Sequence, residues 1–314
     1  MGKPLLDANQ QIEHLKTKGI TFEQISEQEA IEFLGSKTYF FKLYAYRTLF
    51  QKRVGGEHDG EYIGLDFGHL RRLASIDQQL RYAMLPLTLD VEHFARTKLM
   101  QEISTRPDED GYTIVADYLD GLGSSERDRR KQEISRLKND VYSGNLVAKY
   151  PITSMPAWVF LELVTFGTFV DFYLFCAKRW GDSQMKDEHY LLRQAKSARN
   201  AAAHSSNIIN GFVGQRTTVR TNPNVGAALA QAGVSRRVRQ AKMGNPRLQQ
   251  IVTLLYLHTL LVPAGTSRTR AIADLSRLRI QMAECLEAIP DNDAVQSSFR
   301  FLTLLFDRWF LLPS

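Results

Sequence analysis

Hydrophobic residues recur along most of this chain at the spacing of an amphipathic helix. Apolar side chains return every three or four residues within 10–18 and again within 27–34. A much longer stretch of this kind runs from about Asp66 to Ile103. Its apolar positions are Leu70, Leu73, Ile76, Leu80, Met84 and Leu87. We expect Pro86 to kink or divide that helix. Because no convincing alternation of period two occurs, strands should be few and the pattern predicts an all-α fold.

The same periodicity predicts further helices in the second half of the chain. They are an apolar helix at 157–180, a helix at 184–209, a basic helix on a mobile segment at 225–242, and three C-terminal helices at about 246–262, 267–288 and 292–311. Glycine and proline make the intervening residues irregular. We therefore divide the chain into a helical domain at 1–210, a basic, glycine-containing connecting segment at 211–245, and C-terminal helices at 246–314 that pack on the same core.

The most apolar stretch, Ala157 to Ala177, is long enough to cross a membrane. Glu162 and Asp171 lie inside it, however, and each would cost roughly 2.5–3.5 kcal/mol near the centre of a bilayer. Gly167 would let a second helix approach closely. We therefore expect a buried core helix and no contact with a membrane.

Composition indicates a compartment and excludes several classes of protein. Cys176 and Cys285 are the two cysteines, which fits a reducing compartment and excludes a disulfide scaffold or a multi-cysteine zinc site. The first residues contain no apolar core of a secretion signal. Nucleophile elbows, phosphate-binding loops and dinucleotide fingerprints are missing from the sequence. We expect a cytoplasmic protein without a cofactor or a metal.

The net charge of +6 conceals a strong asymmetry along the chain. From Arg193 to Ala273 there are 12 lysines and arginines and no acidic residue, so the remaining residues sum to −6. Such a segment favours binding to a phosphate backbone, with a solvated basic face as the alternative. The residues expected to contact RNA are Arg193, Lys196, Arg216, Arg220, Arg236, Arg237, Arg239, Lys242 and Arg247.

One short segment of the 184–209 helix combines three reactive residue types. Arg199, Asn200 and His204 form the pattern Arg-Asn-x3-His, with alanines at the three intervening positions. On a helix, Asn200 and His204 share a face about 40° apart. Spacing alone is not specific, because Arg53 and His58 repeat it in a glycine-rich loop. The asparagine, the helical setting and the acid-free surroundings favour a site, and a plain helix end is the alternative.

These residue types suit the cleavage of RNA without a metal. Histidine exchanges protons near neutral pH, and arginine stabilises the charge that grows on a pentacovalent phosphate. Asparagine can orient either group. The ribose 2′-OH would be the nucleophile and would leave a 2′,3′-cyclic phosphate. Arg199, Asn200 and His204 are therefore the expected catalytic residues of an endoribonuclease.

Several blocks of the sequence, in order, resemble one protein family. They are KPLLDANQQIEHLKTKGI, YFFKLYAYRTLF, FGHLRRLASIDQQLRYAMLPLTLDVEHFARTKL and YPITSMPAWVFLELVTFGTFVDFY. Together with the Arg-Asn-x3-His pattern, they are similar to the Abi-like proteins, the abortive-infection D/F group of the HEPN ribonuclease superfamily. The resemblance covers roughly residues 3–210. It implies a HEPN-type helical bundle at 1–210, with additional C-terminal helices beyond it.

The resemblance also implies roles for individual residues. It makes Arg199 and His204 catalytic, with Asn200 and Asn210 in support. Glu92 and Arg96 align with a family pair that lines the same cavity, and an i,i+4 structural ion pair is the alternative. The sequence departs from the family at Ser205, where a second histidine is frequent, and at Asn207, where an arginine is common.

The resemblance finally implies partners and a biological role. HEPN nucleases build a composite site from two copies of the motif, so a homodimer is expected. The family acts in phage defence or as a toxin, and its members are associated with a structured noncoding RNA. DNA is not an expected partner. The alternatives are a non-catalytic RNA-binding protein and a HEPN toxin restrained by a protein antitoxin.

Overall fold

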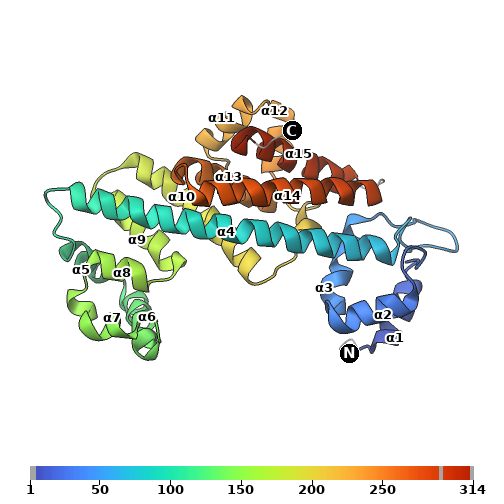
Figure 1. Ribbon diagram of the computed structural model, residues 1–314, viewed down its shortest axis with the longest axis horizontal. Coiled ribbons are helices and arrows are strands. Elements are labelled where there is room, and N and C mark those ends of the chain that lie inside the picture. The colour runs from blue at the N-terminus through green and yellow to red at the C-terminus, as the bar shows by residue number, and fades with distance from the viewer. Residues whose placement is uncertain (1–4, 290–292, 312–314) are drawn as a thin grey trace. The chain divides into compact units, whose positions relative to one another are not determined.

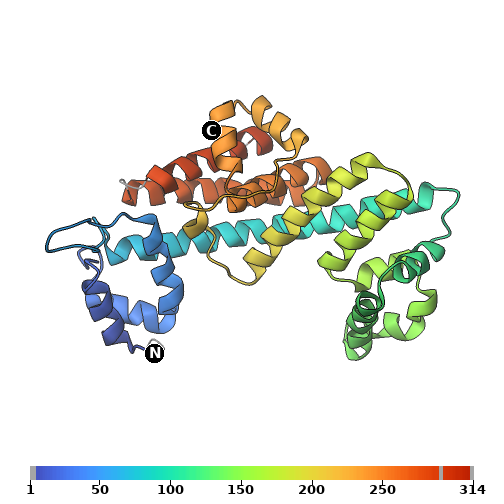
Figure 2. The same cartoon turned by 180° about the vertical axis from the view of Figure 1, so that it is seen from behind.

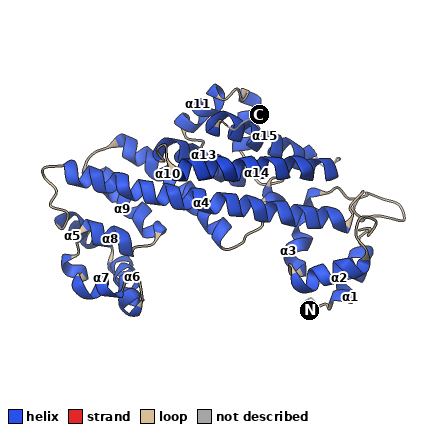
Figure 3. Ribbon diagram, viewed as in Figure 1, coloured by secondary structure: helices blue, strands red, loops and turns tan. Residues whose placement is uncertain are grey.

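Helices dominate the protein. The computed structural model describes residues 5–289 and 293–311, and Figure 3 shows these residues as helices joined by loops. Within those two ranges there is no sheet, and isolated bridges join Thr21 to Asp66 and Lys52 to Tyr62. The all-α prediction is confirmed. The expected segments also included residues 1–4, 290–292 and 312–314, which lie outside the described residues.

The chain divides into two compact units. The first comprises the residues up to Pro86, Arg199–Val252 and the residues from Ala264 onward. The second comprises Leu87–Ala198 and Thr253–Pro263. Each unit therefore combines segments that are far apart in the sequence. The helices that pass from one unit into the other are α4 (Phe67–Thr105), α10 (Ser183–Ala203) and α13 (Pro246–Leu261).

The first unit holds the two ends of the described chain. Its remaining helices are α1 (Ala8–Lys16), α2 (Glu27–Ser36), α3 (Phe40–Tyr44), η1 (Ala45–Leu49), η4 (Ile209–Gly211), α11 (Pro223–Gln231), α12 (Arg236–Met243), α14 (Thr266–Ala288) and α15 (Asp293–Phe310). The helices α1 and α2 each begin with a capping box, at Asp7 and Ser26. In Figure 1, α14 and α15 pack side by side. Local caps thus define the N-terminal helices, while apolar packing joins the C-terminal pair.

The second unit contains the rest of the helices. They are α5 (Thr113–Asp120), α6 (Ser124–Ser135), η2 (Arg136–Asn139), α7 (Gly144–Lys149), η3 (Ile152–Ser154), α8 (Ala157–Leu163) and α9 (Phe166–Arg179). The single apolar helix predicted at 157–180 is wrong, because the chain breaks between α8 and α9. Thr165 caps α9 there, and the Glu133 carboxylate accepts hydrogen bonds from its amide at 2.7 Å and from the Thr168 hydroxyl at 2.7 Å. Among the described residues, no helix has the length and apolarity of a membrane span.

The long helix α4 follows its predicted pattern closely. All six apolar positions named above are at most 3% exposed. The helix continues through Pro86, so the predicted division is wrong. A proline inside a helix costs about 3 kcal/mol, and the buried Met84 and Leu87 on either side of it offset that cost.

Two other predicted helices differ from the structure in extent. The helix predicted at 184–209 ends at Ala203, and the basic helix predicted at 225–242 is replaced by α11 and α12. Gly233 separates these two helices with φ of 85°, a conformation that favours glycine. The chain between α10 and α11, seen from behind in Figure 2, is irregular.

Candidate active site

The helix α10 ends directly before His204. The amide of Ser206 donates to the carbonyl of Ala201 at 2.9 Å, and the amide of Ser205 donates to that of Ala202 at 3.2 Å. This pair of bonds is a Schellman motif, which terminates helices. The motif needs a left-handed residue, and Ser205 supplies it with φ of 54° although that region favours glycine. His204 is therefore the C-cap, one turn beyond Asn200.

The three expected catalytic side chains lie at the end of α10, with Arg199 and Asn200 on the helix and His204 at its C-cap. The Arg199 guanidinium donates to Asn200 Oδ1 at 3.3 Å, and the amide of His204 donates to the Asn200 carbonyl at 3.0 Å. Asn200 and His204 are exposed, whereas Arg199 is half-buried. Within the described part of the chain, the His204 imidazole makes no hydrogen bond. One chain thus orients Arg199 through Asn200 and presents His204 to solvent.

The three alanines between Asn200 and His204 do not all form an open surface. Ala202 is only 6% exposed and packs into the first unit. Ala203 is exposed and Ala201 is half-buried. The open surface that these small residues offer is therefore limited to one side of the helix end, and Ala202 anchors that end in the core.

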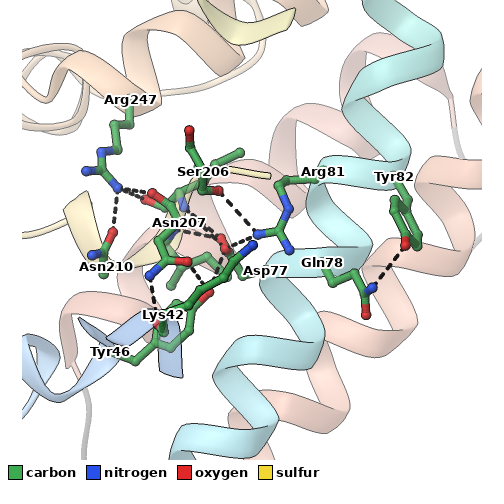
Figure 4. A network of polar contacts seen from close by, with 12 residues as sticks. Lys42, Tyr46, Asp77, Gln78, Arg81, Tyr82, Ser206, Asn207, Asn210 and Arg247 are labelled. Carbon is green, nitrogen blue, oxygen red and sulfur yellow. Dashed lines mark hydrogen bonds and ion pairs between the residues drawn. The ribbon is translucent and has the colours of Figure 1, made fainter. Parts of the chain in front are cut away.

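A buried carboxylate holds the chain that follows His204 (Figure 4). Asp77 of α4 is fully buried, and it accepts hydrogen bonds from the amides of Ile208 at 3.0 Å and Ile209 at 2.8 Å. The Tyr46 hydroxyl donates to the same carboxylate at 2.6 Å, and Arg81 forms a close ion pair with it. Burial and the Asp77 charge raise the pKa of Tyr46 far above its ordinary value, so the phenol stays protonated and donates.

The asparagines of the motif region belong to this same network. Asn207 donates to the Lys42 carbonyl at 2.8 Å and accepts from the Tyr46 hydroxyl at 3.3 Å. Asn210 accepts from the guanidinium of Arg247 at 2.5 Å, and the same guanidinium contacts the backbone carbonyl of Asn207. Burial lowers the pKa of Arg247. Both asparagines therefore shape the loop after the helix, and Arg247 braces it from α13.

The role of Arg247 explains a glycine in this loop. A Cβ on Gly211 would lie 2.1 Å from the Arg247 Nε, which no side chain tolerates. The loop and the guanidinium can pack together only because this position has no side chain.

Glu92 and Arg96 lie in the second unit and form an i,i+4 ion pair at 2.6 Å. The guanidinium also donates to the Val164 carbonyl at 2.9 Å and lies over the Phe169 ring at 5.1 Å from its centroid. These contacts hold the break between α8 and α9. The contacts of Glu92 and Arg96 therefore lie within the second unit and match the alternative of an i,i+4 structural ion pair.

The basic residues expected to contact RNA fall into two groups. Arg193, Arg216, Arg220, Arg236 and Arg237 are exposed. The others are half-buried: Arg239 donates to the Val234 carbonyl at 2.6 Å, Lys242 donates to Ser297 at 2.7 Å, and Arg247 braces the loop, whereas Lys196 makes no hydrogen bond or ion pair among the described residues. Burial lowers the pKa of Lys242. The exposed group supplies the charge available for a phosphate backbone.

Sequence reasoning missed Asp77, Tyr46 and Arg81 as residues of the site region. A signal was present, because Asp77 and Arg81 interrupt the apolar positions between Leu73 and Met84 on α4. A buried carboxylate needs several donors, and the loop after α10 provides them. Among the described residues, no group of three His, Cys, Asp or Glu side chains could hold a metal ion.

A family model matches the part of the chain that contains this site. The model, described as Abi-like protein, matches residues 32–210, which is more than half of the 314 residues and includes the end of α10. No curated protein and no solved structure matches the chain. The resemblance noted in the sequence is confirmed at the level of the family: the chain belongs to the Abi-like proteins.

Proposed function

We propose that this protein is a metal-independent endoribonuclease of the HEPN type that acts in phage defence. Its Abi-like family suggests abortive infection. The observation that carries the nuclease proposal is the end of α10, where Arg199 donates a hydrogen bond to Asn200 and an exposed His204 lies one turn beyond Asn200. An acid-free stretch of chain surrounds this turn, so no carboxylate nearby in the sequence opposes a phosphate.

The three side chains divide the work of phosphodiester cleavage. The ribose 2′-OH attacks the adjacent phosphorus, so a bond from O2′ to phosphorus forms and the bond to the 5′ oxygen of the next nucleotide breaks. His204 exchanges the proton with the reacting oxygens, because an imidazole ring can accept a proton at one nitrogen and donate one from the other. Arg199 stabilises the charge on the pentacovalent phosphate, and Asn200 holds its guanidinium by the 3.3 Å hydrogen bond.

The proposed active form is a homodimer. A cleavage of this kind uses one group to accept a proton and another to donate one. A single motif brings one histidine, and His204 has no hydrogen-bonding partner within the described residues. Two copies of the α10 end, related by a two-fold axis, would supply both groups. The exposed arginines Arg216, Arg220, Arg236 and Arg237 would bind the RNA, including a structured noncoding RNA, by its phosphates.

The proposal predicts a defined product. Wild-type protein in EDTA should cut RNA and leave a 2′,3′-cyclic phosphate and a 5′-OH, and a 2′-deoxynucleotide at the cut position should block that cut. His204→Ala should abolish cleavage while RNA binding persists, because the exposed imidazole holds no part of the fold. Undiminished cleavage by His204→Ala, or cleavage that requires a divalent metal, would refute the proposal.

The exposed arginines also support a second candidate, a non-catalytic RNA-binding protein. Arg216, Arg220, Arg236 and Arg237 can bind phosphates whether or not the motif is catalytic. Tight RNA binding without cleavage, tested over a range of RNAs and conditions, would select this candidate.

A further inference from the structure

A cavity of about 420 Å³ lies in the first unit beside the end of α10. Its walls come from the end of α2, from α3 and η1, and from the first half of α4. Ser205 lines it as well, and this residue directly follows His204. The volume is within the range of about 300–1,000 Å³ that small-molecule sites occupy. The cavity therefore adjoins the proposed catalytic residue and has room for a small ligand.

The walls of this cavity are basic. Four cationic side chains line it, namely Lys37, Lys42, Arg71 and Arg81, and no lining residue carries a carboxylate. Lys37 and Arg71 are exposed, whereas Arg81 is buried and paired with Asp77. A concave site with one sign of charge concentrates ligands of the opposite sign. The cavity is thus built for an anion.

Lys42 identifies where that anion would lie. Its side chain is half-buried, and its amine makes no hydrogen bond within the described residues. Burial and the nearby Arg81 charge lower the pKa of Lys42. Figure 4 shows the Lys42 side chain extending toward Arg81. Since the Asp77 charge is already shared among several donors, a bound anion would supply the missing partner of this amine.

The cavity also offers aromatic faces. Tyr82 is 61% exposed, and its hydroxyl accepts a hydrogen bond from Gln78 at 2.9 Å, which restrains the ring (Figure 4). Phe33 lies under the guanidinium of Arg71, 5.6 Å from the ring centroid. An exposed aromatic ring beside a cationic site is the usual arrangement for a nucleotide, since the base stacks while the phosphate is paired.

We propose that this cavity binds one nucleotide, with its phosphate on Lys37, Lys42 and Arg71 and its base against Tyr82. Resting on the proposed function, we assign the nucleotide to the RNA strand that His204 cleaves. The cavity thereby places a neighbouring nucleotide and brings the scissile phosphate to the end of α10. A free mononucleotide shares this chemistry, and the experiment separates the two sources.

The test measures binding of a fluorescent 2′-O-methyl RNA oligonucleotide, which the proposed mechanism cannot cleave. Lys42→Met should weaken binding about tenfold and reduce the salt dependence by about one phosphate contact. Tyr82→Ala should weaken it at least fivefold, the effect of losing about one base stack. Lys52→Met and Tyr142→Ala are matched controls on exposed side chains outside the cavity, and both should bind as the wild type does.

Arg71→Gln keeps the test decisive if Lys42→Met unfolds, because Arg71 is exposed. Wild-type affinity in Arg71→Gln and Tyr82→Ala would overturn the proposal. Adenosine 5′-monophosphate is titrated as the free nucleotide. Arg71→Gln could abolish binding of this nucleotide and leave the affinity for the RNA strand unchanged. That result would overturn the assignment of the cavity to the RNA strand. Binding of the strand in the cavity by a protein that never cuts RNA would contradict the proposed function alone.

Discussion

The first unit contains two segments with the same spacing of arginine and histidine, and they differ in almost everything else. Arg53 and His58 lie in an irregular loop, where Gly55 and Gly56 have φ of 80° and 77°. Arg199 lies near the end of α10, and His204 is the C-cap of that helix. The same spacing therefore occurs on two different backbones, and only the second pair lies at the end of a helix.

The two segments also differ in what holds them. Local hydrogen bonds close the loop, and in one of them the backbone amide of Arg53 donates to the Glu61 carbonyl at 2.8 Å. On the surface, the His58 imidazole contacts the Glu61 carboxylate at 3.2 Å. The chain after His204 is held by Asp77, more than 120 residues away in the sequence. A buried, non-local anchor fixes a backbone far more firmly than an exposed local turn.

The largest expected difference between the segments is in catalysis. Arg199→Ala should lower the rate of RNA cleavage at least about 100-fold, the usual cost of removing a group that stabilises transition-state charge. Arg53→Ala should leave the rate unchanged, because this side chain is exposed in the loop. Single-turnover cleavage of one labelled RNA measures both variants. Equal losses in the two variants would show that a general effect of charge, rather than the helix end, supports cleavage.

Asp77 holds the chain after His204 and Glu61 holds the loop, and their contributions to the free energy of unfolding should differ by several kcal/mol. Asp77→Asn leaves Arg81 as a buried charge without its counter-ion, so the free energy of unfolding should fall by about 3–5 kcal/mol. Glu61→Gln removes the surface partner of His58 and should change the free energy of unfolding by less than about 1 kcal/mol. Urea denaturation measures both.

A further control separates the anchoring of the site from stability alone. Glu188 is a buried carboxylate whose partners are the side chains of Lys98, Tyr173 and Gln184. Glu188→Gln should also lower the free energy of unfolding, since it removes a buried charge pair. Folded Asp77→Asn protein should cleave RNA more slowly, whereas folded Glu188→Gln protein should keep its rate. Equal rates in the two folded variants would contradict a positioning role for Asp77.

The smallest expected difference concerns backbone strain. Ser205 adopts a left-handed conformation that costs an L-residue about 1–2 kcal/mol, so Ser205→Gly should stabilise the fold by about 0.5 kcal/mol after the entropy of glycine is counted. Gly55→Ala should destabilise it by about 1 kcal/mol, since φ there is 80°. The sign of each shift in thermal midpoint is the measurement, and a loss on Ser205→Gly would mean that the serine hydroxyl is needed.

The sequence predicted the helices well where periodicity is strong. The apolar stripe of α4 and the C-terminal helices were placed within a few residues, because burial of one face follows directly from spacing. The break at Thr165 was missed because it depends on Glu133, a residue from another helix. The end of α10 was missed because the residue in the left-handed conformation is Ser205, not glycine.

Some residues of the candidate site could likewise be predicted from the sequence, and others could not. Arg199, Asn200 and His204 could be singled out because they lie within six consecutive residues. The residues that hold the loop after α10 could not be singled out in this way. Asp77, Tyr46 and Arg247 reach that loop through contacts between segments that are distant in the sequence. Asn210 was expected to support catalysis and Asn207 was a departure from the family pattern, and the side chains of both hold that loop.

The most direct test replaces the arginine and the histidine of each segment together. RNA cleavage in EDTA is compared for Arg199→Ala/His204→Ala and for Arg53→Ala/His58→Ala, with folding checked by thermal unfolding. The first double variant should show no detectable cleavage, and the second should cleave RNA at the wild-type rate. Cleavage by the first at a rate near that of the wild type would contradict the assignment of the α10 end as the active site.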